Sequence, residues 1–366
     1  MMRSFLKSVR GMMRQSFRSV YCLIALVALM LQGCDVHQWP QQRPDEDVEK
    51  IVVPLRLVFD PDFYVWEHHY DPILGKVIED NVGLDVFPEH PGTSWKYTNI
   101  PKTGFQKIHV KAYLSSNRSV IAADETFVRS VDGTLDTDVN IMLEPGVSYD
   151  IVAWSHLISD ADGAAFYDPS DFNRVSIIPD NYVGNTDLRD AFGGRVRAQI
   201  DETAADATVV RMRRPMGKFE LLTTDLSEFL DRETSRRGLP SRARADEYTV
   251  IISFPAYYPS SYSVIEDRLE NSLGGVGFRT RMTVTGESEA SLGFEYVLLN
   301  DISDSGVQTR VDIYDLQGTH VAGSSTITVP MSRDRHTLLR GAFLSTQGSG
   351  GVGIDPGFTG DHNVIW

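Results

Sequence analysis

The sequence predicts an all-β protein with two β-sandwich domains. Short segments with alternating apolar and polar residues recur along the chain, and a period of two is the pattern of a strand buried on one face. Turn residues separate these segments at short intervals, which is typical of sandwiches. A chain of 366 residues is also long enough for two domains of roughly 150 residues each after its N-terminal region.

The N-terminal region has the layout of an export signal. Residues 1–20 contain five basic residues and no acidic one, and residues 21–31 (YCLIALVALML) are apolar throughout. This apolar segment is shorter than the roughly 20 residues that span a bilayer, so we interpret it as the core of a signal peptide. The sequence Leu31-Gln32-Gly33-Cys34 follows and resembles the lipobox of bacterial lipoproteins. We therefore expect removal of residues 1–33 and lipidation of Cys34; an ordinary secreted protein is the alternative.

The cysteine content limits the chemistry of the exported chain. The sequence has two cysteines, Cys22 in the apolar core of the signal and Cys34. After processing and lipidation no thiol remains, which excludes a disulfide, a cysteine-ligated metal and a cysteine nucleophile. The core and the sheets alone must stabilise the fold.

The net charge bears on the partners. The formal charge is −15, and loss of the signal, with its five basic residues and no acid, leaves about −20 on the same count. A protein this acidic repels phosphate backbones and anionic lipid surfaces. We therefore expect no nucleic-acid partner, and we expect the lipid anchor to hold the chain on a membrane, which takes more than one acyl chain.

The composition also indicates the domain boundaries. Residues 35–50 (DVHQWPQQRPDEDVEK) combine two prolines, three glutamines and acidic residues, a composition typical of an extended tether. We expect four segments, which are a signal peptide at 1–33, a tether at 34–50, an N-terminal sandwich at 51–217 and a C-terminal sandwich at 218–366.

Strand patterns fill the first domain. In Gln106–Leu114 the residues Ile108, Val110, Ala112 and Leu114 share one face, as in a half-buried antiparallel strand. The turn Glu144-Pro145-Gly146 separates two further strands, because proline presets one dihedral and glycine accepts a positive φ. The predicted strands are Ile51–Phe59, Gln106–Leu114, Asp138–Leu143 and Ser148–Trp154, with a closing hairpin of Val196–Ile200 and Ala207–Met212.

One helix is predicted near the domain junction. Leu226, Phe229 and Leu230 share a helical face, and Thr224 or Asp225 can cap a helix over Thr224–Leu230. The polar segment Arg232–Arg244 is expected to be an exposed loop whose part Arg236–Arg244 trypsin cuts first. Predicted strands in the second domain are Glu247–Phe254, Gly277–Val284, Leu292–Leu299, Val307–Tyr314, Ser324–Val329 and His336–Leu344.

Three segments contain residues that could bind a metal. Residues 66–71 (WEHHYD) are rich in ligand types, but adjacent histidines on a strand point to opposite faces. The sequence Asp160-Ala161-Asp162-Gly163 begins like a calcium loop, but the later bidentate glutamate is missing, with Asp171 the nearest substitute. Residues 355–363 are similarly rich in turn residues. We interpret all three as ordinary strand ends or turns, and expect no metal and no cofactor.

No catalytic motif is recognisable. The sequence has no Gly-x-Ser-x-Gly elbow, no phosphate-binding loop and no dinucleotide-binding glycine pattern after a strand. Ser349 lies in a glycine-rich segment without a histidine near it in the sequence. We therefore expect that the protein is not an enzyme.

A set of short motifs resembles a fimbrillin-related family of surface lipoproteins, which includes fimbrium subunits and anchors, and within it a subfamily known only as a domain of unknown function. The motifs are Cys34–His37, Trp66–His68, Leu143–Gly146 with Trp154-Ser155, Asp187–Phe192, Arg214–Glu220, Ser291–Val297, His336–Gly341 and Gly360–Asn363. The resemblance implies two transthyretin-like or immunoglobulin-like sandwiches and a surface-exposed position on the outer membrane. It implies no catalytic residue.

Two functions remain open. The first is a fimbrial anchor, accessory subunit or adhesin that acts through protein–protein contacts, for example by accepting a partner strand at an open sheet edge. The alternative is a glycan- or protein-binding module of a nutrient-uptake system, in which Tyr257, Tyr258 and Tyr262 stack on sugars. Ordinary core packing is the competing interpretation of these tyrosines.

Overall fold

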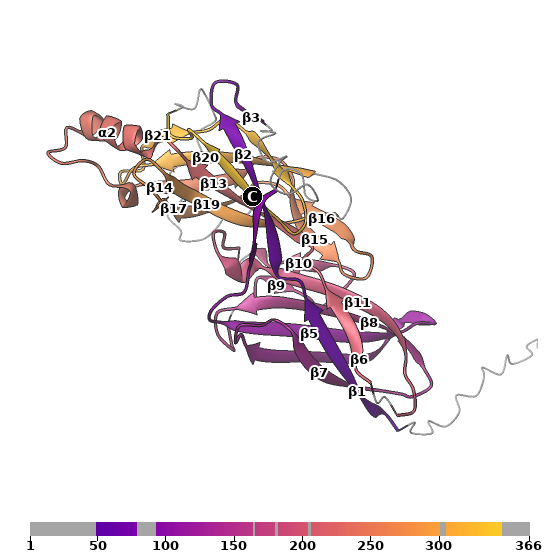
Figure 1. Ribbon diagram of the computed structural model, residues 1–366. Helices are drawn as coiled ribbons and strands as arrows, with labels where there is room; N and C mark the ends of the chain where they lie inside the picture. Colours follow the sequence, from indigo (N-terminus) through magenta and orange to yellow (C-terminus); the bar gives the residue numbers. More distant parts are fainter. Residues whose placement is uncertain are drawn as a thin grey trace, which may run out of the picture. The chain divides into compact units, whose positions relative to one another are not determined.

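The fold is all-β, as the sequence predicts (Figure 1). The computed structural model describes residues 49–78, 93–163, 165–179, 182–203, 206–300 and 305–345. Within these ranges the chain forms many short strands and one α-helix. Cys34, Ser349 and residues 355–363 lie outside the described residues. Lipidation of Cys34 therefore stays a prediction.

Two sheets form a first sandwich. Their strand orders are β12-β1-β7 and β11-β8-β5-β6. Strand β1 runs antiparallel to β7 and parallel to β12. The strands are β1 (Ile51–Phe59), β5 (Phe105–Leu114), β6 (Asn117–Ser130), β7 (Thr137–Leu143), β8 (Ser148–Ile158), β11 (Ala191–Gln199) and β12 (Thr208–Met212).

The core of this sandwich explains the alternation in the sequence. Ile108 and Val110 of β5 are fully buried, and so are Leu55 and Leu57 of β1. These residues belong to one hydrophobic cluster that both sheets share. Each fully buried aliphatic side chain contributes about 1.5–3 kcal/mol to folding. The predicted strands at 51–59, 106–114, 138–143 and 148–154 are thereby confirmed.

A mixed sheet and a five-stranded sheet form the second part of the fold. The mixed sheet has the order β18-β19-β13-β23-β2-β3, with β4 also paired to β2, and the other has the order β17-β14-β20-β21, with β22 paired to β20. The strands are β2 (Asp62–Asp71), β3 (Lys76–Ile78), β4 (Thr93–Thr98), β13 (Met216–Thr223), β14 (Thr249–Phe254), β17 (Val276–Arg281), β18 (Thr283–Val284), β19 (Ala290–Leu298), β20 (Ser305–Tyr314), β21 (His320–Gly323), β22 (Ile327–Met331) and β23 (Arg335–Gly341).

Strand β2 departs from the simple order of the sequence. It follows β1 directly, yet it pairs in parallel with β23, near the other end of the described chain. A small sheet, β16-β15-β10-β9, likewise joins β9 (Tyr167–Asp168) and β10 (Val175–Ile177) to β15 (Tyr258–Ser263) and β16 (Arg268–Leu273). Alternation shows which face of a strand is buried and not which strand is its partner, so these pairings were not predictable. The boundary at residue 217 stays a prediction.

The helix is longer than the sequence predicts. Helix α2 spans Leu226–Arg237, and Gly238, at φ 61°, ends it by donating its N–H to carbonyls of the last turn. Glu233 is buried on the same face as Leu226 and Phe229, because the Arg236 guanidinium bonds its carboxylate at 2.7 Å. A charged residue thus continues the apolar stripe, which the sequence pattern did not reveal.

This helix corrects the first half of the predicted exposed loop, whereas residues 238–244 form no helix or strand and are mostly exposed, as predicted. Arg236 also forms an ion pair with Asp315 at 2.9 Å, and Arg237 pairs with Glu247 at 2.6 Å. Both arginines are therefore held on the helix, beside β14 and β21 (Figure 1), and cleavage by trypsin is not expected at them. Early cleavage at Arg242 or Arg244, which lie in the exposed loop, stays a prediction. The described part of the chain contains no helix that is long and apolar enough to cross a membrane.

Candidate functional site

Strand β6 forms a free edge of the first sandwich. It is the last strand in the order β11-β8-β5-β6 and pairs with β5 along one side. It has fourteen residues, which is long for a strand in a globular protein. No other described strand pairs with its second side. The N–H and C=O groups along that side can therefore pair with an added strand.

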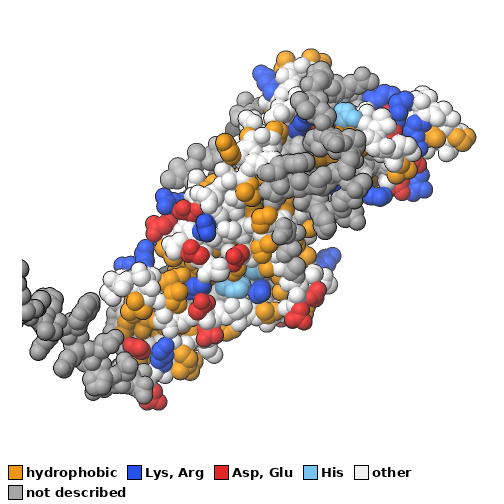
Figure 2. Space-filling model, turned by 180° about the vertical axis from the view of Figure 1, so that it is seen from behind, with side chains coloured by type: hydrophobic (Ala, Val, Ile, Leu, Met, Phe, Trp, Pro, Cys, Tyr) orange, Lys and Arg blue, Asp and Glu red, His pale blue; other side chains and the backbone are white. Residues whose placement is uncertain are grey.

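Aliphatic side chains accompany this free edge. Val120, Ile121 and Val128 are 41%, 49% and 43% exposed. Exposed hydrophobic side chains are interspersed with charged ones on the face that Figure 2 shows, and single exposed residues of this kind are ordinary. What distinguishes β6 is that its aliphatic residues lie on one strand with an unpaired backbone.

The hairpin of β5 and β6 shows how the sequence produces this edge. A turn at Ser115 and Ser116 reverses the chain, and the pairing register shifts twice near Tyr113, where β6 has more residues than β5 opposite them. Such bulges twist the end of a strand. Most of β6 is exposed on both faces, so its sequence does not alternate and the strand was not predicted.

The tyrosines expected to stack on a sugar do not form a common surface. Tyr258 and Tyr262 are only 1% and 3% exposed, whereas Tyr257 is 81% exposed. The Tyr258 hydroxyl donates to the carbonyl oxygen of Tyr296 at 2.9 Å, and the Tyr262 hydroxyl bonds the Asp267 carboxylate. The stacking prediction is wrong for Tyr258 and Tyr262, because β15 is covered on both faces.

The segments with metal-ligand residue types do not converge. His68 and His69 follow each other on β2, with His69 the more exposed. In the acidic turn, the Asp160 carboxylate accepts a hydrogen bond from the backbone N–H of Asp162 at 3.1 Å, and the Asp160 carbonyl accepts one from Gly163 at 2.9 Å. Among the residues that the structure describes, no three His, Cys, Asp or Glu side chains are grouped to hold a metal ion.

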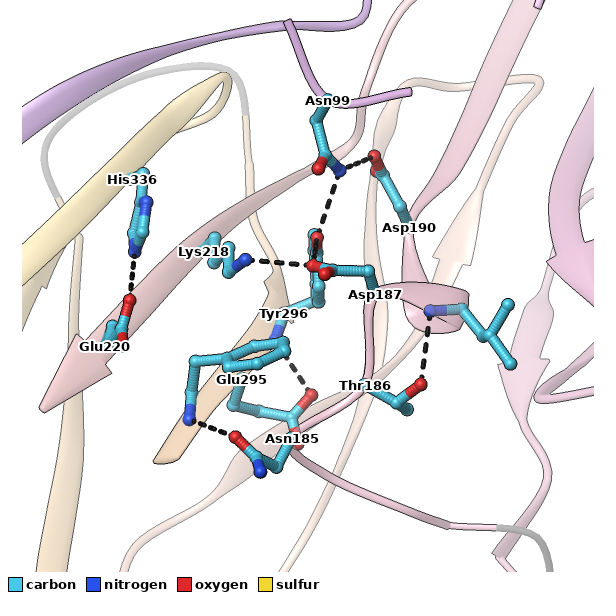
Figure 3. Close-up of polar contacts among 12 residues, drawn as sticks. Asn99, Asn185, Thr186, Asp187, Asp190, Lys218, Glu220, Glu295, Tyr296 and His336 are labelled. Atoms are coloured by element: carbon cyan, nitrogen blue, oxygen red, sulfur yellow. Dashed lines mark hydrogen bonds and ion pairs between the residues drawn. The ribbon is translucent and has the colours of Figure 1, made fainter. Parts of the chain in front are cut away.

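A network of buried polar and ionisable side chains lies in the described chain. The Arg214 guanidinium bonds the two Asp190 oxygens at 2.7 and 2.9 Å, and both side chains are fully buried. The Asn99 amide donates to Asp190 at 2.9 Å and to the Tyr296 hydroxyl at 3.1 Å (Figure 3). That hydroxyl in turn donates to Asp187 at 2.6 Å.

Lys218 completes this part of the network. Its ammonium bonds Asp187 at 2.9 Å (Figure 3). Burial acts to raise the pKa of Asp187, but the Lys218 charge and the hydrogen bonds from Lys218 and Tyr296 together outweigh it, so the pKa is lowered. Burial also raises the pKa of the Tyr296 phenol well above its ordinary value. At neutral pH the Asp187 carboxyl is therefore ionised and the Tyr296 phenol is protonated.

A second buried pair lies next to this network. Arg189 and Glu295 are 3.1 Å apart and almost fully buried, and the Tyr182 hydroxyl donates to Glu295 at 3.1 Å. Burial raises the pKa of Glu295 in spite of the Arg189 charge. Arg189 also lies over the Tyr182 ring, 4.4 Å from its centroid, an arrangement that stabilises a buried cation.

The network joins distant segments of the chain. It connects Asn99, the short 3-10 helix Asp187–Arg189, strand β13 and strand β19. Its charges are paired with one another inside the protein. We therefore assign the network a structural role, which is to fix the first sandwich to the mixed sheet. Local sequence patterns do not reveal this network, because the paired residues come from distant segments of the chain.

The model of a known protein family matches most of the chain. Residues 101–365 match a family described as a family of unknown function (DUF6562). The chain belongs to this family. The match confirms the resemblance of the sequence motifs to a subfamily known only as a domain of unknown function. No curated protein matches the sequence.

The chain is also similar in fold to several solved structures. One is the fimbrial anchor protein Mfa2 from Porphyromonas gingivalis, with 12% identity, a TM-score of 0.36, and coverage of 74% of this chain and 82% of that one. Another is a fimbrial assembly protein from Parabacteroides distasonis, with 9% identity, a TM-score of 0.37, and coverage of 82% and 94%. At these identities the likeness concerns the fold alone.

Proposed function

We propose that this DUF6562 protein is a lipid-anchored protein on the outer surface of the outer membrane. It acts through protein–protein contacts as a fimbrial anchor, accessory subunit or adhesin. The observation that carries the proposal is the free edge of β6, a long strand whose second side has no described partner. Two proteins of similar fold are named as a fimbrial anchor and a fimbrial assembly protein, but the proposal rests on β6.

Strand addition is the mode of contact that this edge supports. A partner segment in extended conformation would form a ladder of backbone hydrogen bonds with β6, each contributing about 1 kcal/mol net. Because each bond contributes little, affinity has to come from the whole ladder and from contacts with Val120, Ile121 and Val128. Loss of one surface side chain should then weaken binding only slightly.

The first prediction concerns the anchor. Replacing Cys34 by alanine should move the protein out of the membrane fraction and abolish labelling by a fatty-acid analogue, because the thiol that carries the lipid is gone. Cys22→Ala is the matched control and should be labelled normally, since residue 22 belongs to the signal. Undiminished labelling of the Cys34→Ala protein would show that the anchor lies elsewhere.

The second prediction concerns the β6 edge and uses single thiols. Because removal of the signal and lipidation of Cys34 are expected to leave no free thiol, a Val128→Cys substitution provides a single reactive thiol on β6. Tyr257→Cys provides one on an exposed residue elsewhere. With a short crosslinker that carries a maleimide for this thiol and a photoreactive diazirine for the partner, applied to intact cells, the Val128→Cys protein should form one discrete adduct whose partner mass spectrometry identifies as a strand-rich surface protein. The Tyr257→Cys protein should form none.

Two neighbouring prolines test whether this contact is a backbone ladder. Adjacent N–H groups on an edge strand point to opposite sides, so of Glu125→Pro and Thr126→Pro one removes a hydrogen bond to β5 and the other a donor on the free side. In the Val128→Cys background, the proline on the free side should leave the melting temperature nearly unchanged and abolish the adduct. Adduct formation that survives both prolines, or equal adducts at both thiols, would contradict the proposal.

A further inference from the structure

A cavity lined by arginines lies beside strands β11 and β12, which belong to different sheets of the first sandwich. Its volume is about 520 Å³, within the range of small-molecule sites. Four arginines line it, and one acid, Asp267, faces them. The arginines are Arg195 of β11, Arg211 of β12, and Arg213 and Arg333 from the segments next to β12 and β23. Such a concentration of positive charge is notable in a chain with a net charge of −15.

A single backbone bridge between the two strands brings these charges together. Gly193 and Arg213 exchange two backbone hydrogen bonds, of 2.9 and 2.8 Å, in an antiparallel bridge. Arg195 and Arg211 are each two residues away from this bridge on their own strand. Since side chains two residues apart share a face of a strand, Arg195, Arg211 and Arg213 lie on the same face. Like charges placed this way repel one another.

The protein neutralises only part of this charge. Arg333 forms an ion pair with Asp267 at 2.8 Å and lies 5.3 Å from the centroid of the Tyr262 ring. Arg195 donates a hydrogen bond to the carbonyl oxygen of Ile265. The exposed side chains of Arg211 and Arg213 have no hydrogen-bond or ion-pair partner among the residues that the structure describes.

A neighbouring cavity provides the contrast. It shares Arg195 with the first cavity and is also lined by Arg118 of β6 and Arg197 of β11. Both pair with Asp150, at 2.7 and 2.6 Å, so a carboxylate of the protein satisfies them. At Arg211 and Arg213 the corresponding carboxylate is missing from the described chain, and an anion supplied from outside would take its place.

The shape of the cavity favours a compact anion over an added strand. A Cβ atom on Gly194 would lie 2.5 Å from the carbonyl oxygen of Arg211 and 2.7 Å from the sulfur of Met212. The β11 and β12 backbones are therefore in contact at this point, and no third strand fits between them. A ligand has to lie on the arginine face, where Val209, 44% exposed, offers an apolar surface next to the charges.

We propose that this cavity binds an acidic saccharide, a sugar unit that carries a carboxylate or a sulfate. Arg211 and Arg213 bind the acidic group through charge-assisted, two-pronged hydrogen bonds. The aliphatic side chain of Val209 packs against the C–H face of the ring. The site is separate from the β6 edge, so this proposal and the proposed strand addition can fail independently.

The test is a binding titration of the purified full-length protein by calorimetry at low salt. The probes are trigalacturonate, a sulfated trisaccharide, the neutral trisaccharide maltotriose and tetraglutamate. We expect saturable binding of one or both acidic saccharides, at least tenfold weaker binding with Arg211→Ala/Arg213→Ala, and a loss of affinity as salt increases. Comparison of the two acidic probes shows whether carboxylate or sulfate is preferred.

Arg174→Ala is the matched control, since Arg174 is exposed and does not line the cavity. It should bind as the wild type does. The unliganded Arg211→Ala/Arg213→Ala protein should melt at the same temperature as the wild type or higher, because the substitutions remove repulsion. Failure to bind either acidic saccharide, equal binding of maltotriose, tighter binding of tetraglutamate, or equal losses in Arg174→Ala would each overturn the proposal.

Discussion

Replacing Asp190 by alanine is expected to lower the free energy of unfolding by about 3–5 kcal/mol, which is the cost of leaving a buried charge without its partner. Arg214 is fully buried and lies over the ring of Phe63, 3.8 Å from its centroid. It also donates to the carbonyl oxygens of Pro61 and Asp62, at 3.2 and 3.1 Å. These oxygens hold the guanidinium in place but do not neutralise it. The carboxylate of Asp334, which is 40% exposed and 3.4 Å away, is a longer and better solvated ion pair, so it replaces Asp190 only in part.

A comparison within the chain makes this prediction specific. Asp150 also binds two arginines, but their side chains are 45% and 63% exposed, so Asp150→Ala should cost about 1 kcal/mol or less. Urea unfolding at neutral pH measures both losses. The double variant Asp190→Ala/Arg214→Met should recover much of the loss, because it removes the stranded charge. Equal losses for Asp190→Ala and Asp150→Ala would refute the structural role of the network.

Acid is expected to destabilise the protein through two stacked histidines. The rings of His109 and His156 are 5.7 Å apart and nearly parallel, and His156 is 1% exposed. Burial lowers the pKa of His156 to about 3 and that of His109 to about 4. Neither ring nitrogen of His156 has a hydrogen-bond partner in the part of the chain that the structure describes, so nothing there stabilises the imidazolium.

The sign of the effect follows from proton binding. Below pH 6.5 the unfolded chain takes up protons on these histidines while the folded protein does not, so acid favours unfolding. Between pH 6.5 and 4 the loss from His156 is about 1.4 kcal/mol per pH unit, or about 3 kcal/mol in all. The His156→Leu protein should show a shallower dependence of the free energy of unfolding on pH over this interval.

The pH series contains its own control. Burial raises the pKa of Asp334 to about 6, and this carboxyl titrates in the same interval with the opposite effect on stability. It is present in both proteins, so the difference between wild type and His156→Leu cancels it. At pH 8 the same difference gives the packing effect alone. Parallel curves between pH 6.5 and 4 would show that His156 does not cause the acid sensitivity.

Local patterns predicted those strands that have one buried face. Residues 106–114 alternate because Ile108 and Val110 enter the core of the first sandwich, and the structure has β5 there. Residues 117–130 form β6, but most of the strand is exposed on both faces. Burial on one face causes alternation, so a strand without it leaves no pattern. The edge that carries the proposed function was therefore not visible in the sequence.

The candidate sites were less predictable than the fold, because they depend on contacts between distant residues. Tyr258 and Tyr262 have the residue type that binds sugars, yet the packing of β15 buries them. Arg211 and Arg213 alternate with apolar residues, as charges on any exposed strand do. Only the bridge between Gly193 and Arg213 places them on one face with Arg195, and only the tertiary structure shows which arginines have no carboxylate beside them.

The sequence by itself determined the all-β class, the strong negative charge and the expected thiol-free body behind Cys34, because each follows from composition or from local periodicity. The tertiary structure decided the parallel pairing of β2 with β23, the burial of Asp190 with Arg214 and the stacking of His109 on His156. The physical reason is that a strand's sequence encodes which of its faces is buried. The packing of the whole chain determines which strand pairs with it. The same packing determines which charged side chains lie next to one another.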